Sequence, residues 1–287
     1  MPDHIGKEED WRILARAVSC HGAGRLEDAV LYYQRFLEAN PASDVARYNL
    51  GLAYFQGGSY LQAKSAFSMA AGLNPQEADY WFNLGLACKK LHCFGEAVTA
   101  YKNALKLQPD DTDILYNLGC CCRDCGELDQ AVLVYSHLLE IDPAYAPALN
   151  SLAYVYHLQD RFAEALKKYQ EFLELEPENE QAQYMCAALK GKEAAAPPAA
   201  YVKELFDKYS QGFDKHLTEN LGYQAPHILL ALLDRFAPKK QYSRVLDLGC
   251  GTGLCGSLLR PLTERLTGVD LSPRMLMQAE EKNAMIH

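Results

Sequence analysis

The stretch NLGLACKKLHCFGEAVTAYKNALKLQP, residues 83–109, carries the pattern that decides most of the fold. Its Leu84-Gly85 pair, its Ala97 and Tyr101 four residues apart, and its closing Pro109 recur in step along the chain. The prolines alone stand at 41, 75, 109, 143 and 177. Four-residue spacing puts the alanine and the aromatic ring on one helix face, and a proline prevents the next helix from starting early. The 34-residue period therefore predicts repeated helix pairs.

This pattern resembles that of tetratricopeptide repeats. Five repeats are expected from about Asp10 to Pro177, followed by a capping helix at residues 178–190, so that the repeat domain covers residues 1–190. The resemblance implies a superhelix in which the first helix of each pair lines a concave groove for protein or peptide partners. The residue before each Leu-Gly pair would then face the groove: Asn49, Asn83 and Asn117.

Two interpretations of these asparagines remain open. An asparagine row can hydrogen-bond both the N–H and the C=O of an extended peptide, and would then bind backbone whatever its sequence. Alternatively, asparagine is simply common at this position in such repeats.

A different pattern begins after residue 190. Residues 191–200, GKEAAAPPAA, are small residues and two prolines without periodicity, which predicts a linker to a domain at residues 201–287. Within that domain, residues 245–253 read VLDLGCGTG, an apolar run that passes into alternating glycines, and an apolar stretch follows at residues 254–259. We predict a strand buried on both faces, a glycine loop and a helix, the opening unit of a Rossmann-like α/β domain. The expected fold is mainly α, a repeat superhelix followed by the N-terminal part of such a domain.

Two acidic residues indicate which nucleotide the loop would bind. Asp247, two residues before Gly249, would repel a pyrophosphate but suits a ligand with an ammonium and a sulfonium group. Asp270 ends the next apolar stretch, where an acceptor for ribose hydroxyls is expected. A glycine loop alone could also be an ordinary tight turn.

The pair VLDLGCGTG and LTGVDLS, residues 245–253 and 266–272, resembles the first two motifs of class I S-adenosylmethionine-dependent methyltransferases. The resemblance implies the cofactor S-adenosyl-L-methionine. It also implies a set of cofactor-binding residues: Asp247, Gly249, Cys250, Gly251, Thr252, Gly253, Asp270 and Leu271. No catalytic residue can be named.

The helical region before the glycine loop looks like the lead-in of bacterial methyltransferases fused to tetratricopeptide repeats, through its FD-x-Y-x-x-x-FD-x-HL spacing at residues 206–217. In the wider family such a lead-in lies over the cofactor. Tyr209 is therefore a candidate contact, although plain helix packing explains it equally well. His216 is expected to be structural, because no cysteine or carboxylate partner is apparent near it in sequence.

The last predicted helix starts at Ser272-Pro273, a serine cap followed by a first-turn proline, and runs toward Met285. With only two predicted strands, we expect the chain to be a fragment of a longer methyltransferase that binds the cofactor weakly or not at all by itself. A different class of function also fits: a non-catalytic repeat scaffold that binds extended peptide segments.

Composition limits the partners and the compartment. The net charge is −9, and the acidic excess lies in residues 1–200, so nucleic acid is not expected as a partner. No apolar run is long enough for a membrane span. Ten cysteines without a secretory signal suggest reduced thiols in the cytoplasm. No metal is expected, because the single C-x-x-C at Cys122–Cys125 cannot complete a zinc site, and the neighbouring cysteines fit helix packing.

Overall fold

The computed structural model describes residues 2–191, 197–237 and 241–282, and the surroundings of side chains from residue 10 onward. The chain divides into two compact units, residues 1–178 and 179–287.

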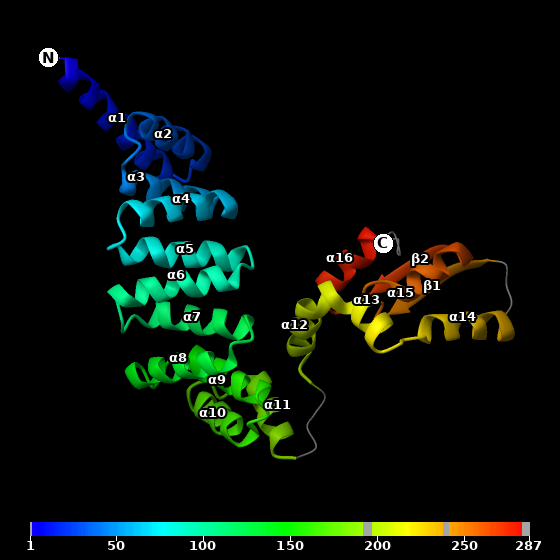
Figure 1. Cartoon of the computed structure of the whole chain (residues 1–287). Helices are drawn as coiled ribbons and strands as arrows, with labels where there is room; N and C mark the ends of the chain where they lie inside the picture. Colours follow the sequence, from blue (N-terminus) through cyan, green and yellow to red (C-terminus); the bar gives the residue numbers. More distant parts are fainter. Residues whose placement is uncertain (1, 192–196, 238–240, 283–287) are drawn as a thin grey trace. The chain divides into compact units, whose positions relative to one another are not determined.

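The first unit is a stack of helix pairs (Figure 1). Its described residues form ten helices in five pairs, as the 34-residue period predicts, with no strand among them. The pairs are α1 Pro2–Gly22 with α2 Leu26–Ala39, α3 Asp44–Gln56 with α4 Tyr60–Leu73, α5 Ala78–Lys90 with α6 Phe94–Leu107, α7 Thr112–Asp124 with α8 Leu128–Ile141, and α9 Ala146–Leu158 with α10 Phe162–Leu175.

The glycine of each Leu-Gly pair lets the two helices of a repeat approach closely. A Cβ added to Gly85 would lie 2.5 Å from the ring of Tyr101, and one added to Gly119 would lie 2.5 Å from the ring of Tyr135. Both rings are fully buried. The space that a side chain would need is therefore filled by the aromatic residue of the partner helix, which explains why glycine recurs at this position.

The clustered cysteines pack in this unit. Cys120, Cys121 and Cys122 are buried on α7, and burial raises the pKa of Cys121 to about 12 and that of Cys122 to about 11, so both stay neutral thiols. All ten cysteines of the chain are free thiols. Among the described residues, no group of His, Cys, Asp and Glu could hold a metal ion, and no helix is both long and apolar enough to cross a membrane.

The second unit contains two strands, with short helices before, between and after them in the chain (Figure 1). Its helices before the sheet are α11 Glu180–Leu189, α12 Ala199–Tyr209, α13 Phe213–Lys215 and α14 Ala225–Phe236, with a short 3-10 turn at Ser210–Gly212 and a π turn at His216–Asn220. The helix expected at residues 178–190 is present as α11. Because it falls in the second unit, its role as a cap of the repeats remains a prediction.

The sheet consists of β1 Tyr242–Leu248 and β2 Thr263–Val269, which pair in parallel with Asp247 opposite Gly268. The helix α15 Leu254–Leu259 connects them through a 3-10 turn at Arg260–Leu262. After β2, Ser272 caps α16 Pro273–Glu281 by accepting the Met275 N–H. The predicted continuation of this helix toward Met285 lies outside the described residues beyond position 282.

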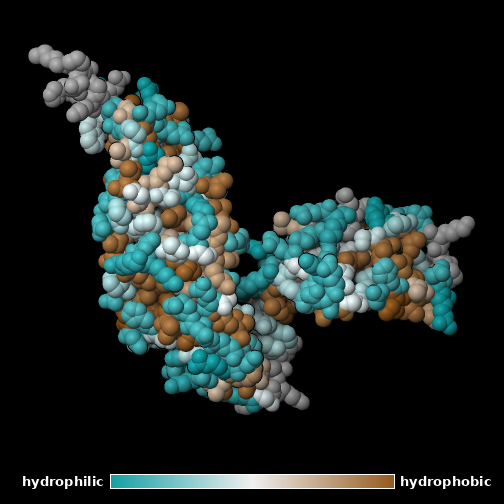
Figure 2. Space-filling view, viewed as in Figure 1, coloured by the Kyte–Doolittle hydropathy of each residue, from teal (hydrophilic) through white to brown (hydrophobic). Residues whose placement is uncertain are grey.

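One expectation about β1 is wrong. It was expected to be buried on both faces, but Leu246 and Leu248 are 59% and 74% exposed, whereas Val245 and Asp247 are half-buried. This alternation means that the described residues cover only one face of the strand. The exposed apolar side chains of α14 add to the apolar surface of this unit (Figure 2).

Candidate functional site: a pocket at the glycine loop

The loop after β1 has a backbone that glycine alone adopts easily. Gly249, Gly251 and Gly253 have φ values of 74°, 54° and 79°, all in the left-handed region. The N–H groups of Gly249 and Cys250 donate to the carbonyl of Val269 at 2.7 and 3.1 Å. These bonds hold the loop against the end of β2, next to Asp270.

Asp270 joins the loop to the start of α16 with both of its carboxylate oxygens. Its Oδ2 accepts the Gly251 N–H at 2.8 Å, and its Oδ1 accepts the Ser272 N–H at 2.9 Å. A carboxylate oxygen can accept more than one hydrogen bond, so each oxygen retains acceptor capacity for a ligand.

Beside Asp270 lies a cavity of about 480 Å³. Its walls are apolar apart from Asp270 and the loop backbone. They are formed by Val202, Phe206, Phe213, Gly249, Gly251, Val269, Asp270, Leu271 and Met275. The pocket is thus large enough for a small molecule and combines one charged acceptor with apolar and aromatic surface.

Asp247 lies beside the loop, and one of its carboxylate oxygens accepts no hydrogen bond from the described residues. The side chain is half-buried, and its buried Oδ2 has no hydrogen-bond partner among the described residues. Burial, and secondarily the negative charge of Asp270, raises the pKa of Asp247 above its ordinary value. A carboxylate in this state is electrostatically suited to a cationic ligand.

The sequence-predicted cofactor residues separate into two groups. Gly249, Gly251, Asp270 and Leu271 line the pocket. The others do not line it: Asp247 at the end of β1, and Cys250, Thr252 and Gly253 in the loop itself. Thr252 is 1% exposed, and its hydroxyl donates to Asp214 of the lead-in.

The pocket wall formed by Phe206 and Phe213 was not predicted from the sequence. Tyr209, the expected candidate, does not line the pocket; its ring packs against Phe213 and His216 with centroids 5.4 and 5.5 Å apart. His216 also contacts the Asn220 amide at 3.3 Å, a local structural contact. The sequence did contain a signal for the aromatic wall of the pocket, namely two Phe-Asp pairs seven residues apart.

In the repeat unit, the predicted asparagines make contacts within and between repeats. The Asn83 amide N–H₂ donates to the hydroxyl of Tyr48 in the preceding repeat and to the Asp79 carbonyl. Asn117 donates to the Asp113 carbonyl and accepts a hydrogen bond from Lys89 at 2.9 Å. Since Asn83 uses both amide hydrogens, it offers a ligand chiefly its carbonyl oxygen.

Asn49 occupies the equivalent place on α3 and is half-buried. The three asparagines therefore share one register position on α3, α5 and α7, the first helices of three consecutive repeats.

Comparisons with known families distinguish the same two regions. Families described as tetratricopeptide or TPR repeats match residues 21–76, 48–88, 78–111, 100–132, 122–160 and 146–179. A family described as a methyltransferase domain matches residues 245–286. No curated protein matches the chain in sequence.

Several solved structures resemble the chain. The MamA protein is 24% identical with a TM-score of 0.57, covering 67% of this chain and 100% of its own. YrrB, described as a TPR protein with an unusual peptide-binding site, is 22% identical with a TM-score of 0.58, covering 66% and 97%. MamA of Desulfovibrio magneticus RS-1 is 18% identical with a TM-score of 0.55, covering 59% and 96%. At such identities the likeness shows the fold alone. The N-terminal unit of the chain is therefore a tetratricopeptide-repeat array, and a segment similar to the methyltransferase-domain family follows it in sequence.

Proposed function

We propose that the chain binds S-adenosyl-L-methionine in the pocket beside Asp270, that its reaction is S-adenosylmethionine-dependent methyl transfer, and that its repeats bind a protein or peptide. The observation that carries the proposal is Asp270, which presents a carboxylate with spare acceptor capacity at an apolar pocket bordered by a glycine loop. When bound, this cofactor supplies an electrophilic methyl group on a sulfonium sulfur.

The residues of the site fit the parts of this cofactor. The Asp270 carboxylate suits the two ribose hydroxyls, and the apolar walls suit the adenine ring. The unpaired Asp247 oxygen favours the positively charged methionine end, while Gly249 and Gly251 leave room for it along the loop. All ten cysteines are free thiols, which supports a cytoplasmic location for this activity.

A ligand panel tests the proposal. Because weak binding is expected, we would titrate the 287-residue chain by ligand-detected NMR with S-adenosylmethionine, S-adenosylhomocysteine, ATP and NAD⁺. S-adenosylmethionine and S-adenosylhomocysteine should bind. ATP and NAD⁺ should bind at least about tenfold more weakly, because the carboxylates of Asp247 and Asp270 repel their phosphate groups. Stronger binding of ATP or NAD⁺ would indicate a nucleotide site of another class. If no ligand of the panel binds, the proposed binding of the cofactor by this chain is wrong, and the scaffold alternative stands for the chain.

Asp247→Asn should stabilise the ligand-free second unit and weaken S-adenosylmethionine binding. The raised pKa of Asp247 means that the fold penalises its charged form, and asparagine removes this penalty at neutral pH. This stabilisation should shrink as the pH falls from the raised pKa of Asp247 toward the ordinary pKa of an aspartate. In that range Asp247 of the natural chain becomes protonated in the folded state and is then as neutral as asparagine. Affinity for the cationic cofactor should fall about tenfold at neutral pH, since an attractive charge is lost.

Hydrogen exchange of β1 and β2 measures this stability, because both tryptophans, Trp11 and Trp81, lie in the repeat unit and do not report on the second one. Asp234→Asn, at an exposed position of α14, is the control. Faster exchange of the strands in Asp247→Asn at neutral pH would contradict the predicted penalty.

In the repeat array, changing Asn49, Asn83 and Asn117 together to alanine should weaken partner binding more than tenfold. Each lost hydrogen bond costs about 0.5–1.5 kcal/mol, and the three act in one row. Helical content and melting temperature should change little, because alanine is a better helix former than asparagine. Recovery of the partner from lysate measures binding, and far-ultraviolet circular dichroism on heating measures helical content and melting temperature.

Asn103→Ala is the matched control for this triple variant, because Asn103 lies on α6, the second helix of its pair. Equal recovery of the same partners by the triple variant would mean that the asparagine row only packs between the repeats.

A further inference from the structure

The lead-in contains two Phe-Asp pairs, and in both of them the phenylalanine and the aspartate make the same kinds of contact. Phe206 and Phe213 line the pocket, while the next residues, Asp207 and Asp214, bond to the α/β part of the unit. In each pair, the ring thus lines the pocket while the carboxylate next to it in sequence bonds to another element. The lead-in segment, residues 199–220, is thus attached at two points beside the pocket.

The first attachment is at the start of α16. Asp207 Oδ1 accepts the hydroxyl of Ser272 at 2.5 Å and the backbone N–H of Arg274 at 3.3 Å. The Ser272 bond above all lowers the pKa of Asp207, so the carboxylate is charged at neutral pH. Ser272 also caps α16 and follows Leu271 of the pocket wall, which connects this attachment directly to the site.

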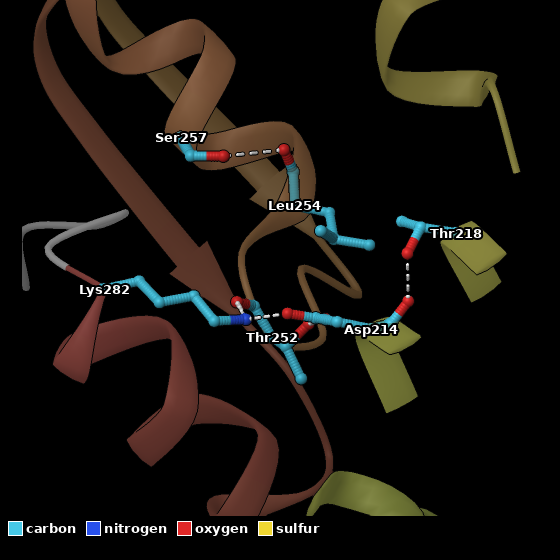
Figure 3. A network of polar contacts seen from close by, with 6 residues as sticks. All are labelled: Asp214, Thr218, Thr252, Leu254, Ser257 and Lys282. Atoms are coloured by element: carbon cyan, nitrogen blue, oxygen red, sulfur yellow. Dashed lines mark hydrogen bonds and ion pairs between the residues drawn. The ribbon is translucent and has the colours of Figure 1, made fainter. Parts of the chain in front are cut away.

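The second attachment is on the glycine loop itself (Figure 3). Asp214 accepts hydrogen bonds from the Thr252 hydroxyl and from the ammonium group of Lys282, just after α16. Lys282 also donates to the Thr252 carbonyl at 3.1 Å, and Thr218 donates to the Asp214 carbonyl at 2.8 Å. The network therefore joins the lead-in, the loop and the end of α16.

The rings that these attachments hold are close to the loop. The Phe213 ring would lie 3.6 Å from a Cβ at Gly251, an ordinary van der Waals distance. Phe206 meets Phe213 with ring centroids 6.2 Å apart and planes at 77°, and Tyr209 supports Phe213 edge-on from outside the pocket. The two phenyl rings form an aromatic wall facing the loop and Asp270.

We propose that Asp207 and Asp214 are positioning residues that hold the lead-in segment against the glycine loop, so that Phe206 and Phe213 form the wall on which a flat heteroaromatic base lies. The identity of that base as the adenine of the cofactor rests on the proposed function. The attachment itself does not, because its bonds exist in the ligand-free protein.

The experiment measures attachment and binding separately in the 287-residue chain. Hydrogen exchange by mass spectrometry follows residues 199–220 without ligand, and ligand-detected NMR follows S-adenosylhomocysteine as the probe. The variants are Asp207→Asn, Asp214→Asn, Lys282→Met and Phe213→Leu. The matched control is Glu204→Gln, which breaks an ion pair between Glu204 and Lys208 that stays within α12.

Each aspartate variant should raise hydrogen exchange in residues 199–220 and lower the affinity for S-adenosylhomocysteine at least tenfold. Hydrogen exchange in β1 and β2 should stay as in the natural chain. Asp214→Asn and Lys282→Met should be non-additive in combination, because they break one ion pair. Phe213→Leu should lower the affinity for S-adenosylhomocysteine about two- to tenfold, the loss expected for an aromatic contact. It should leave hydrogen exchange in residues 199–220 unchanged.

Three results would overturn the proposal: unchanged exchange in both aspartate variants, increased exchange with unchanged probe affinity, or effects equal to those of Glu204→Gln. If the natural chain does not bind the probe, the proposed function fails, and exchange alone then decides whether the two aspartates hold the segment.

Discussion

Replacing Gly251 by valine should abolish S-adenosylmethionine binding by the chain. The residue has a φ of 54°, where a β-branched side chain is strained, and it lines the pocket. Its added Cβ would already be 3.6 Å from Phe213, so the two further methyl groups of valine would occupy the space between the loop and the aromatic wall. Ligand-detected NMR should show no S-adenosylmethionine signal at concentrations at which the natural chain gives one.

Gly222→Val separates loss of pocket space from backbone strain. Gly222 has nearly the same φ, 58°, but is exposed, and no atom lies within 4 Å of its Cβ position. This variant carries similar local strain and should retain cofactor binding. Retained binding in Gly251→Val, or loss in both variants, would contradict the placement of the ligand against the loop.

Gly85→Ala should destabilise the repeat unit by about 1–3 kcal/mol, the usual cost of overpacking a core. In an open helix the same change is stabilising, by up to about 1 kcal/mol. Here the new methyl group would lie 2.5 Å from the buried Tyr101 ring, which has to move together with its neighbours. The close contact therefore outweighs the helix propensity. Denaturant unfolding followed by tryptophan fluorescence measures the change, because Trp81 lies on α5 four residues before Gly85.

Gly72→Ala on α4 is the matched control, since no atom lies within 4 Å of its Cβ position. It should be neutral or slightly stabilising. If Gly85→Ala proves as stable as Gly72→Ala, the tight approach of paired helices is not what the glycine provides.

The repeat array could be predicted closely from the sequence because its determinants are local. Within one repeat, the small residue, the alanine, the aromatic ring and the proline specify a helix pair, and the 34-residue period repeats that information five times. The hydrogen bonds of the asparagine row could not be predicted. They depend on Tyr48 and Lys89 from neighbouring repeats, whose reach is a matter of tertiary packing.

In the second unit, the parts encoded by neighbouring residues were predicted and the parts formed by distant ones were not. The glycine loop, the end of β2 at Asp270 and the serine cap of α16 each lie within a few residues of their signal. The burial of β1 was mispredicted because it depends on what covers the strand. The aromatic wall was missed because it arises from Phe206 and Phe213, which are brought to the loop by bonds across more than thirty residues.

We propose that Asp270 accepts the two ribose hydroxyls of an adenosine-containing cofactor. The most direct test compares adenosine with 2′,3′-dideoxyadenosine, by ligand-detected NMR, on the natural chain and on Asp270→Ala. The natural chain should prefer adenosine by about ten- to a hundredfold, corresponding to about 1–3 kcal/mol for hydroxyls left poorly paired. In Asp270→Ala this preference should disappear. An equal affinity of the natural chain for both nucleosides, or the same preference in the variant, would mean that Asp270 does not bind the ribose hydroxyls.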